Sequence, residues 1–261
     1  MTIYRGITHA HSTYSFDGTM SLQEIRTLCL KAGYTFALMT EHVEGMSNDG
    51  FAAFLLECRQ LSDEDFLFVP GLEFHAECVS TNGIRELMDM SCGRKRVLEE
   101  CLKQDTFNVL VHPRLLAERR RRALPDALHA VEVWNAKYDG ARYPSPHSLA
   151  LFRELARERG CSAVVGIDLH HSAQLVSLYV SVDLERLAVD PLLEVLRSGQ
   201  QRVGHRAGLI EFPFPRMARL RVGAYAAFYN AASRNYGWIR RLLPAGVEKQ
   251  LKTWINGRRY E

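Results

Sequence analysis

Histidines and acidic residues of this chain recur beside short apolar segments. Seven of the 10 histidines lie in such places, namely His9, His11, His42, His75, His112, His170 and His171. Carboxylates stand near them at Asp17, Glu73 and Asp168. Imidazole and carboxylate groups together suit zinc, manganese or iron. Because these groups outnumber the ligands of one tetrahedral ion, we expect a site with two or three divalent metal ions.

A cluster of this kind is suited to catalysis of phosphoryl transfer. Metal ions placed a few ångströms apart clamp both the attacking and the leaving oxygen of a phosphoryl transfer. The residue types therefore predict hydrolysis of a phosphate ester.

The apolar segments that precede these residues are predicted to be strands. They are short, β-branched or aromatic, and mostly without alternation, as strands buried on both faces of a parallel sheet are. The predicted strands cover residues 6–9, 36–40, 66–73, 109–112, 130–134, 162–167 and 178–182. With helical patterns between them, they predict an α/β fold, a closed or nearly closed barrel, with a doubly wound open sheet as the alternative. A barrel gathers the carboxyl ends of its strands, and hence these histidines, on one face.

The helical patterns carry end signals. Ser21, with Glu24 three residues later, is a capping-box pattern, and Gly33 stands where a glycine ends a helix. Residues 148–160 are amphipathic and also end in a glycine, Gly160. These signals predict helices on either side of the strands.

The sequence changes character at about residue 204. Beyond it come a proline-punctuated connector and two helical patterns rich in aromatic residues and arginine, with 12 Lys/Arg against 3 Asp/Glu from Arg202 onward. We predict a barrel over residues 1–203 and a basic, aromatic-rich helical extension over residues 204–261. The extension suits nucleic acid, a membrane surface or a protein partner, although packing of its aromatic residues on the barrel is the commoner arrangement.

The composition is that of an ordinary globular protein, with 47% hydrophobic and 24% charged residues. The first residues lack the basic and apolar regions of a signal peptide. The six cysteines are scattered, without a C-x-x-C pair, as reduced thiols are. We therefore expect a cytoplasmic protein.

Five sequence runs resemble the motifs of one family, in that family's order. They are HAHSTYSFDG (residues 9–18), TEH (40–42), PGLE (70–73), VHP (111–113) and GIDLH (166–170). The first resembles H-x-H-S/T-x-x-S-x-D-G of the PHP (polymerase and histidinol phosphatase) domain, and Glu41 replaces the usual Asp of the second. Over roughly residues 5–185 the chain is similar to this superfamily of metal-dependent phosphoesterases. The resemblance implies a distorted (β/α)7 TIM-like barrel with a trinuclear metal centre.

The resemblance also implies the ligands of each metal. The first metal, at the catalytic residues, would be held by His9, His11, Glu73 and Asp168. The second would be held by Glu73, which bridges, by His112 and, at an unusually close spacing, by His75. The third would be held by Asp17, His42 and His170. A metal-bound hydroxide would then attack phosphorus.

Three residues are candidates for contact with the substrate. The family often places a basic residue near the phosphate, and Arg114, directly after VHP, is the first candidate, with Arg142 the second. Asn135 follows the predicted strand 130–134 and is expected to face the site.

The predicted function is therefore that of a metal-dependent phosphoesterase acting on a small phosphorylated substrate. One alternative is a nuclease-like phosphodiesterase on nucleic acid ends, held by the basic extension, which predicts steep salt dependence of binding. The other is a non-catalytic, metal-stabilised barrel that binds a partner or a membrane through the extension.

Overall fold

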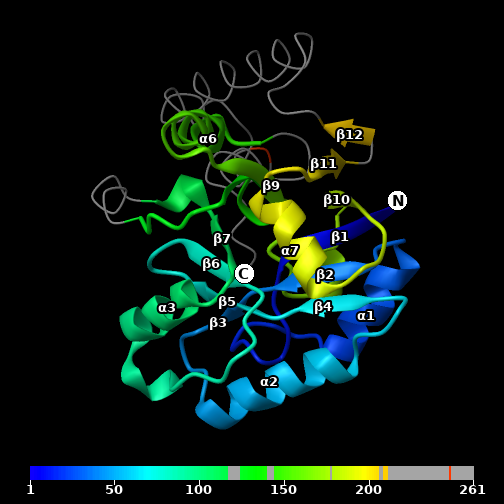
Figure 1. The fold of residues 1–261 in the computed structure, drawn as a ribbon, viewed down its shortest axis with the longest axis vertical. Coiled ribbons are helices and arrows are strands. Elements are labelled where there is room, and N and C mark those ends of the chain that lie inside the picture. Colours follow the sequence, from blue (N-terminus) through cyan, green and yellow to red (C-terminus); the bar gives the residue numbers. More distant parts are fainter. Residues whose placement is uncertain (117–123, 140–143, 177, 206–207, 211–246, 248–261) are drawn as a thin grey trace.

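The fold is mixed α/β, with two six-stranded sheets and helices around them (Figure 1). A computed structural model describes residues 1–116, 124–139, 144–176, 178–205, 208–210 and 247. The α/β class predicted from the sequence is confirmed. Most of the predicted basic extension, residues 211–246 and 248–261, lies outside the described residues.

The first sheet has the strand order β12-β11-β10-β1-β2-β4. Its strands are β1 (Thr2–Ala10), β2 (Phe36–Met39), β4 (Leu67–Val69), β10 (Tyr179–Leu184), β11 (Arg202–His205) and β12 (Gly208–Ile210). The β1, β2 and β4 strands are parallel, whereas β10 is antiparallel to β1. The β11 strand spans the predicted boundary between residues 203 and 204, and the division into two parts stays a prediction.

The second sheet has the strand order β3-β5-β6-β7-β8-β9. Its strands are β3 (Glu41–His42), β5 (Gly71–Phe74), β6 (Val79–Asn82), β7 (Phe107–Leu110), β8 (Ala130–Asn135) and β9 (Ser162–Gly166). All its pairs are parallel except those of β6, which is antiparallel to β5 and to β7.

The two sheets are connected at several places. The chain passes from β2 to β3 across Thr40 alone, and from β4 to β5 across Pro70 alone. The segment after β9 joins β1, because Leu169 N donates to His9 O (3.1 Å) and His11 N donates to Leu169 O (2.8 Å). These connections bring the carboxyl ends of strands from both sheets together.

The helices lie around the periphery of the strands, with α1 and α2 at one edge and α6 at the other (Figure 1). They are α1 (Leu22–Lys31), α2 (Asn48–Gln60), α3 (Arg94–Lys103), α5 (Ala136–Asp139), α6 (Pro146–Arg159) and α7 (Val189–Arg197). Within the described part of the chain, none of them is long and apolar enough to cross a membrane.

The helix ends follow the predicted signals. At α1 the capping box is formed, because Ser21 Oγ accepts from Glu24 N and the Glu24 carboxylate accepts from Ser21 N. Gly33 has φ +81°, which ends the helix. The α6 helix begins at Pro146, before the predicted residue 148, and ends at Gly160 in the left-handed conformation.

Candidate metal centre

The predicted ligands stand at the carboxyl ends of strands. His9 is the residue before the last of β1, His42 ends β3, Glu73 lies in β5, and His112 and Asp168 follow β7 and β9. These five residues are buried, with at most 6% of the surface of each exposed. Buried ionisable groups need partners, and here the partners are one another.

The backbone is strained at three of these residues. The φ angles of His9, His112 and Asp168 are +63°, +45° and +57°, in the left-handed region that L-residues seldom adopt. At His9 the register of β1 against β2 shifts between Thr8 and Ala10, as in a β-bulge. Such strain, of about 1–3 kcal/mol for each residue, persists where the surroundings require it, and it clusters at functional sites.

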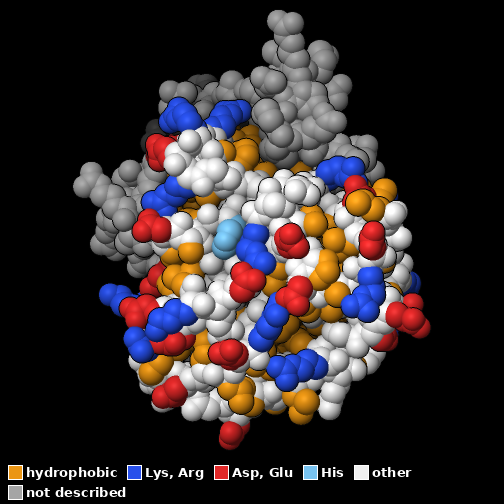
Figure 2. Space-filling model, viewed as in Figure 1, with side chains coloured by type: hydrophobic (Ala, Val, Ile, Leu, Met, Phe, Trp, Pro, Cys, Tyr) orange, Lys and Arg blue, Asp and Glu red, His pale blue; other side chains and the backbone are white. Residues whose placement is uncertain are grey.

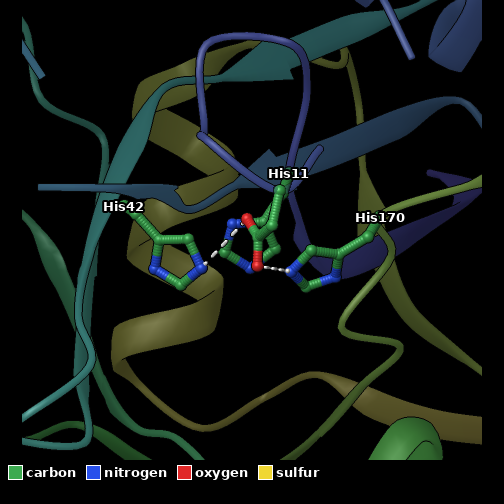
Figure 3. A group of neighbouring side chains, drawn as sticks. His11, His42 and His170 are labelled. Carbon is green, nitrogen blue, oxygen red and sulfur yellow. Dashed lines mark ion pairs between the residues drawn. The ribbon is translucent and has the colours of Figure 1, made fainter. Parts of the chain in front are cut away.

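One group of ligands surrounds Asp17. The Asp17 carboxylate lies 3.4 Å from His42 Nε2 and 3.0 Å from His170 Nε2. The imidazoles of His11, His42 and His170 point toward one another around this carboxylate (Figure 3). One donor atom from each of the four residues can lie within 4.8 Å of the others, which suits a single cation.

A second part of the centre is built around Glu73, which is fully buried. Its Oε2 atom lies 3.3 Å from both His9 Nε2 and His11 Nε2. Its Oε1 atom lies 3.3 Å from His112 Nδ1 and 3.6 Å from His75 Nδ1. Because its two oxygens face different histidines, Glu73 has the geometry of a bridging carboxylate.

Asp168 has a similar position. Its Oδ1 atom lies 3.5 Å from His11 Nε2 and 3.6 Å from His9 Nε2, while Oδ2 lies 3.2 Å from His112 Nε2. The Nζ atom of Lys137 lies 3.5 Å from the same Oδ2.

All nine predicted ligands fall into four overlapping groups that can hold a metal ion. The groups are His11, Asp17, His42 and His170; His9, His11 and Glu73; His9, His112 and Asp168; and Glu73, His75 and His112. His75 is thus placed with Glu73 and His112, as its assignment to the second metal requires. That these residues bind metals stays a prediction.

Buried atoms without hydrogen bonds test whether metals fit this centre. Among the described residues, the buried side-chain atoms that lack a hydrogen-bond partner include His11 Nε2, His42 Nδ1, Glu73 Oε1, Asp168 Oδ2 and both ring nitrogens of His112. Such atoms in a buried site call for an ion or water. They are imidazole and carboxylate donors, the set that divalent transition metals prefer, so the residues fit.

The charges of the centre alter its pKa values. Burial opposes protonation of His9, but Glu132, Asp168 and Glu73 outweigh it and raise the pKa well above the ordinary value. Burial also opposes protonation of His11, but the carboxylates of Asp168 and Glu73 beside its Nε2 atom nevertheless raise its pKa to about 9. The histidines in turn hold the pKa values of Glu73 and Asp168 well below the ordinary range, against the effect of burial. The centre therefore favours positive charge, which metal ions supply by displacing protons.

Glu132, a residue not predicted from the sequence, orients two ligands. It is buried in β8, and its Oε1 atom accepts from His9 Nδ1 at 2.8 Å while Oε2 accepts from His112 N at 2.9 Å. With its Nδ1 proton held there, His9 has Nε2, on the side of Glu73, as the atom that would ligate a metal ion once its proton is displaced. The signal in the sequence is a single carboxylate within the apolar strand AVEVWN, because a charge so placed needs a buried partner.

Glu41 orients His11 through Ser15. It is fully buried and accepts from Ser12 Oγ at 2.6 Å and from Ser15 Oγ at 2.5 Å. Because Ser15 gives its only proton to Glu41, its oxygen accepts from His11 Nδ1, 3.3 Å away. His11 therefore also presents Nε2 to the centre.

A cavity of about 360 Å³ opens onto the centre. Besides predicted ligands such as Asp17, Glu73 and His75, it is lined by Phe16, Lys137 and Tyr138. A larger surface groove of about 870 Å³, beside Arg85 and Leu87, contains none of the predicted ligands, so we assign the site to the smaller cavity.

The predicted substrate-binding residues have other contacts in the structure. Arg114 donates from Nη1 to Tyr138 O at 3.0 Å and is not among the residues that line the cavity. Asn135 is buried, and its Oδ1 atom accepts from Lys137 N and Tyr138 N at the start of α5. Arg142 lies outside the described residues. Substrate binding by these three residues stays a prediction.

Comparisons with known proteins identify the fold. No family model and no curated protein matches this sequence. A two-domain protein from Bacteroides vulgatus that contains a predicted PHP-like metal-dependent phosphoesterase matches with a TM-score of 0.56 and 16% identity, over 80% of this chain and 67% of that one. PsfC from Pseudomonas syringae matches with a TM-score of 0.53 and 13% identity, over 89% and 99% of the two chains.

The lesion-specific endonuclease PfuEndoQ from Pyrococcus furiosus also matches, with a TM-score of 0.52 and 13% identity. This match covers 77% of the present chain but 58% of the endonuclease, so the chain spans little more than half of that enzyme. At these identities the likeness is one of fold. The chain has the fold of PHP-like metal-dependent phosphoesterases.

Proposed function

We propose that this protein is a metal-dependent phosphoesterase that hydrolyses a small phosphate ester. The observation that carries the proposal is the position of Glu73, whose two oxygens face separate histidine groups at the floor of an open cavity. A buried carboxylate so placed is costly unless cations neutralise it.

Two or three divalent ions of zinc, manganese or iron would occupy the centre. The first would be held by His9, His11, Glu73 and Asp168, the second by Glu73, His75 and His112, and the third by Asp17, His42 and His170. When bound, such ions act as Lewis acids that activate water and neutralise charge on the transferring phosphoryl group. The chain itself keeps the ligands oriented, through Glu132 at His9 and through Ser15 at His11.

We further propose that Lys137 contacts the phosphate. It lines the cavity, and 22% of its side chain is exposed. Its Nζ atom lies near Asp168 Oδ2 (3.5 Å) and His170 Nε2 (3.4 Å). With Asp168 neutralised by a bound metal ion, the ammonium group of Lys137 would be available to attract an anion in the cavity.

The two sheets are, in this proposal, parts of one distorted (β/α)7 barrel. In support, β2 continues into β3 and β4 into β5, so the parallel strands of the first sheet extend into the second. Hydrogen bonds from Ile167 N to Thr8 O and from Leu169 N to His9 O link β1 to the end of β9.

The proposal is tested with p-nitrophenyl phosphate and bis-p-nitrophenyl phosphate. Turnover of either ester that a chelator abolishes and added zinc, manganese or iron restores would support it. The preferred ester separates monoesterase from diesterase chemistry. Absence of turnover of both esters with every metal would refute the proposal and favour the non-catalytic barrel.

A nuclease is the second candidate, because one structural neighbour is a lesion-specific endonuclease. On the face in Figure 2, basic and acidic side chains of the described residues are interspersed, without an extended basic surface. In this candidate, the predicted basic extension would bind the strand. Binding of single-stranded DNA that weakens steeply with salt would favour this candidate.

The cytoplasmic location of the protein also stays a prediction.

A further inference from the structure

Phe16 is an unusual surface residue. Its exposed fraction is 75%, and among the large exposed hydrophobic residues that the structure describes it is the only aromatic one. It is also one of the residues that line the cavity over the metal centre. An exposed aromatic ring at the edge of a binding cavity is a feature of ligand recognition.

The ring of Phe16 has one covered face. It stacks on the imidazole of His42, with 5.0 Å between ring centroids and 23° between planes. Because three quarters of the residue is exposed, the opposite face of the ring is open to a ligand.

The turn that contains Phe16 is fixed by contacts of the residues before and after it. Ser15, before it, donates to Glu41 at 2.5 Å, and Asp17, after it, lies 3.0 Å from His170. Gly18 packs so closely on Ser12 that an added Cβ would lie 2.0 Å from Ser12 O. The ring is thus positioned before any ligand arrives, which lowers the entropy cost of binding.

We propose that Phe16 is a stacking platform for a planar aromatic group of the substrate, and that the substrate is a nucleoside monophosphate. This inference rests on the proposed phosphoesterase function and assigns its substrate class. The phosphate would lie at the metal centre beside Lys137, and the base would stack on the open face of Phe16. A cavity of about 360 Å³ lies at the small end of the range for small-molecule sites, which favours a mononucleotide over a polymer.

A different role for Phe16 makes a different prediction. If the ring only shields His42 from water, its removal would weaken turnover of every phosphate ester to the same degree. If it stacks on a base, its removal weakens only substrates that carry a ring.

The test compares adenosine 5′-monophosphate with ribose 5-phosphate. Both esters release a primary hydroxyl group of a ribose, but ribose 5-phosphate has no base. Stacking of one base is worth about 5- to 150-fold. We expect wild-type kcat/KM to favour the nucleotide by at least about fivefold, mainly through KM. Phe16→Ala should bring the ratio close to one, and Phe16→Trp should keep it. Leu56→Ala, at a residue 54% exposed on α2, is the matched control and should leave the ratio unchanged.

Equal use of both esters by the wild type, or an equal loss of both in Phe16→Ala, would overturn the proposal.

Calorimetric titration of the metal-loaded protein with adenosine tests the stacking role of Phe16 independently of the proposed phosphoesterase activity. Adenosine binding that Phe16→Ala abolishes, in a protein that cleaves no ester, would support the platform and refute the phosphoesterase. Adenosine binding equal in wild type and Phe16→Ala would refute the platform whatever the activity.

Discussion

At the scale of single residues, Glu73 is the position in the centre where we expect a substitution to affect metal binding most. Its replacement by Gln keeps the size of the side chain but removes the negative charge that faces five histidines. We expect Glu73→Gln to bind fewer metal ions per chain and to lose about 100-fold or more in kcat/KM, as when a charge-stabilising group is removed. Elemental analysis and ester hydrolysis measure the two effects. Glu44→Gln, which changes another carboxylate at the same cavity, is the control. Unchanged metal content in Glu73→Gln would argue against a bridging role.

Glu132 gives a second prediction at this scale. In Glu132→Gln the amide cannot accept on both sides, so the bonds to His9 Nδ1 and His112 N are not both kept. Loss of such an orienting partner costs about 10–100-fold in metal affinity or activity. Metal affinity is measured by competition with a chromophoric chelator. An affinity equal to that of the exposed variant Glu158→Gln would mean that Glu132 does not orient the ligands.

The sequence predicts the candidate metal ligands better than it predicts the residues that orient them. His9 and His11 stand two apart at the end of a predicted strand, a spacing that predicts both imidazoles on one side. Glu132 acts through His9, which is 123 residues away in the sequence. Lys137 reaches the centre only because the short helix α5 follows β8 directly. Contacts between residues so far apart depend on how the strands pair, which no local pattern encodes.

At the scale of elements, helix ends and most apolar strands were predictable, but the strands β6, β11 and β12 were not among those predicted. The β6 strand (VSTN) is short and mostly polar, so by itself it has the composition of a loop. All four of its residues are buried nevertheless, because β5 and β7 pair with it on both sides. Its antiparallel direction also departs from the parallel arrangement that the sequence favours.

Gly166, at the end of β9, provides a test of packing between elements. A Cβ there would lie 1.6 Å from Glu132 Oε1 and 3.1 Å from His9 Cβ. We expect Gly166→Ala to lower the free energy of unfolding by about 1–3 kcal/mol, as overpacking does, and to reduce metal affinity by displacing Glu132. Denaturant unfolding measures the first effect. Gly50→Ala in α2, where a Cβ would meet only side-chain atoms, at 3.1 Å or more, should instead change the free energy of unfolding by no more than about 1 kcal/mol. Equal stability of the two variants would contradict this packing.

At the scale of the whole molecule, the centre couples stability to pH when metals are removed. The pKa of His11 is raised from 6.5 to about 9, so its contribution to stability is complete below pH 6.5 and is lost as pH rises to 9. The lowered pKa values of Glu73 and Asp168 give stability that is lost only in acid. We therefore expect the Tm of chelated protein to fall between pH 6.5 and 9. The Tm of metal-loaded protein should not fall in this range, because ligation needs unprotonated histidine. A chelated protein whose Tm stays level or rises there would contradict the charge arrangement described.

The most direct test of the central claim is the number of metal ions per chain, measured by elemental analysis of freshly purified protein before and after chelation, together with phosphate ester turnover. We predict two to three ions per chain, and turnover that disappears and returns with them. Fewer than one ion per chain under every loading condition, with no turnover, would contradict the account of a metal-dependent phosphoesterase.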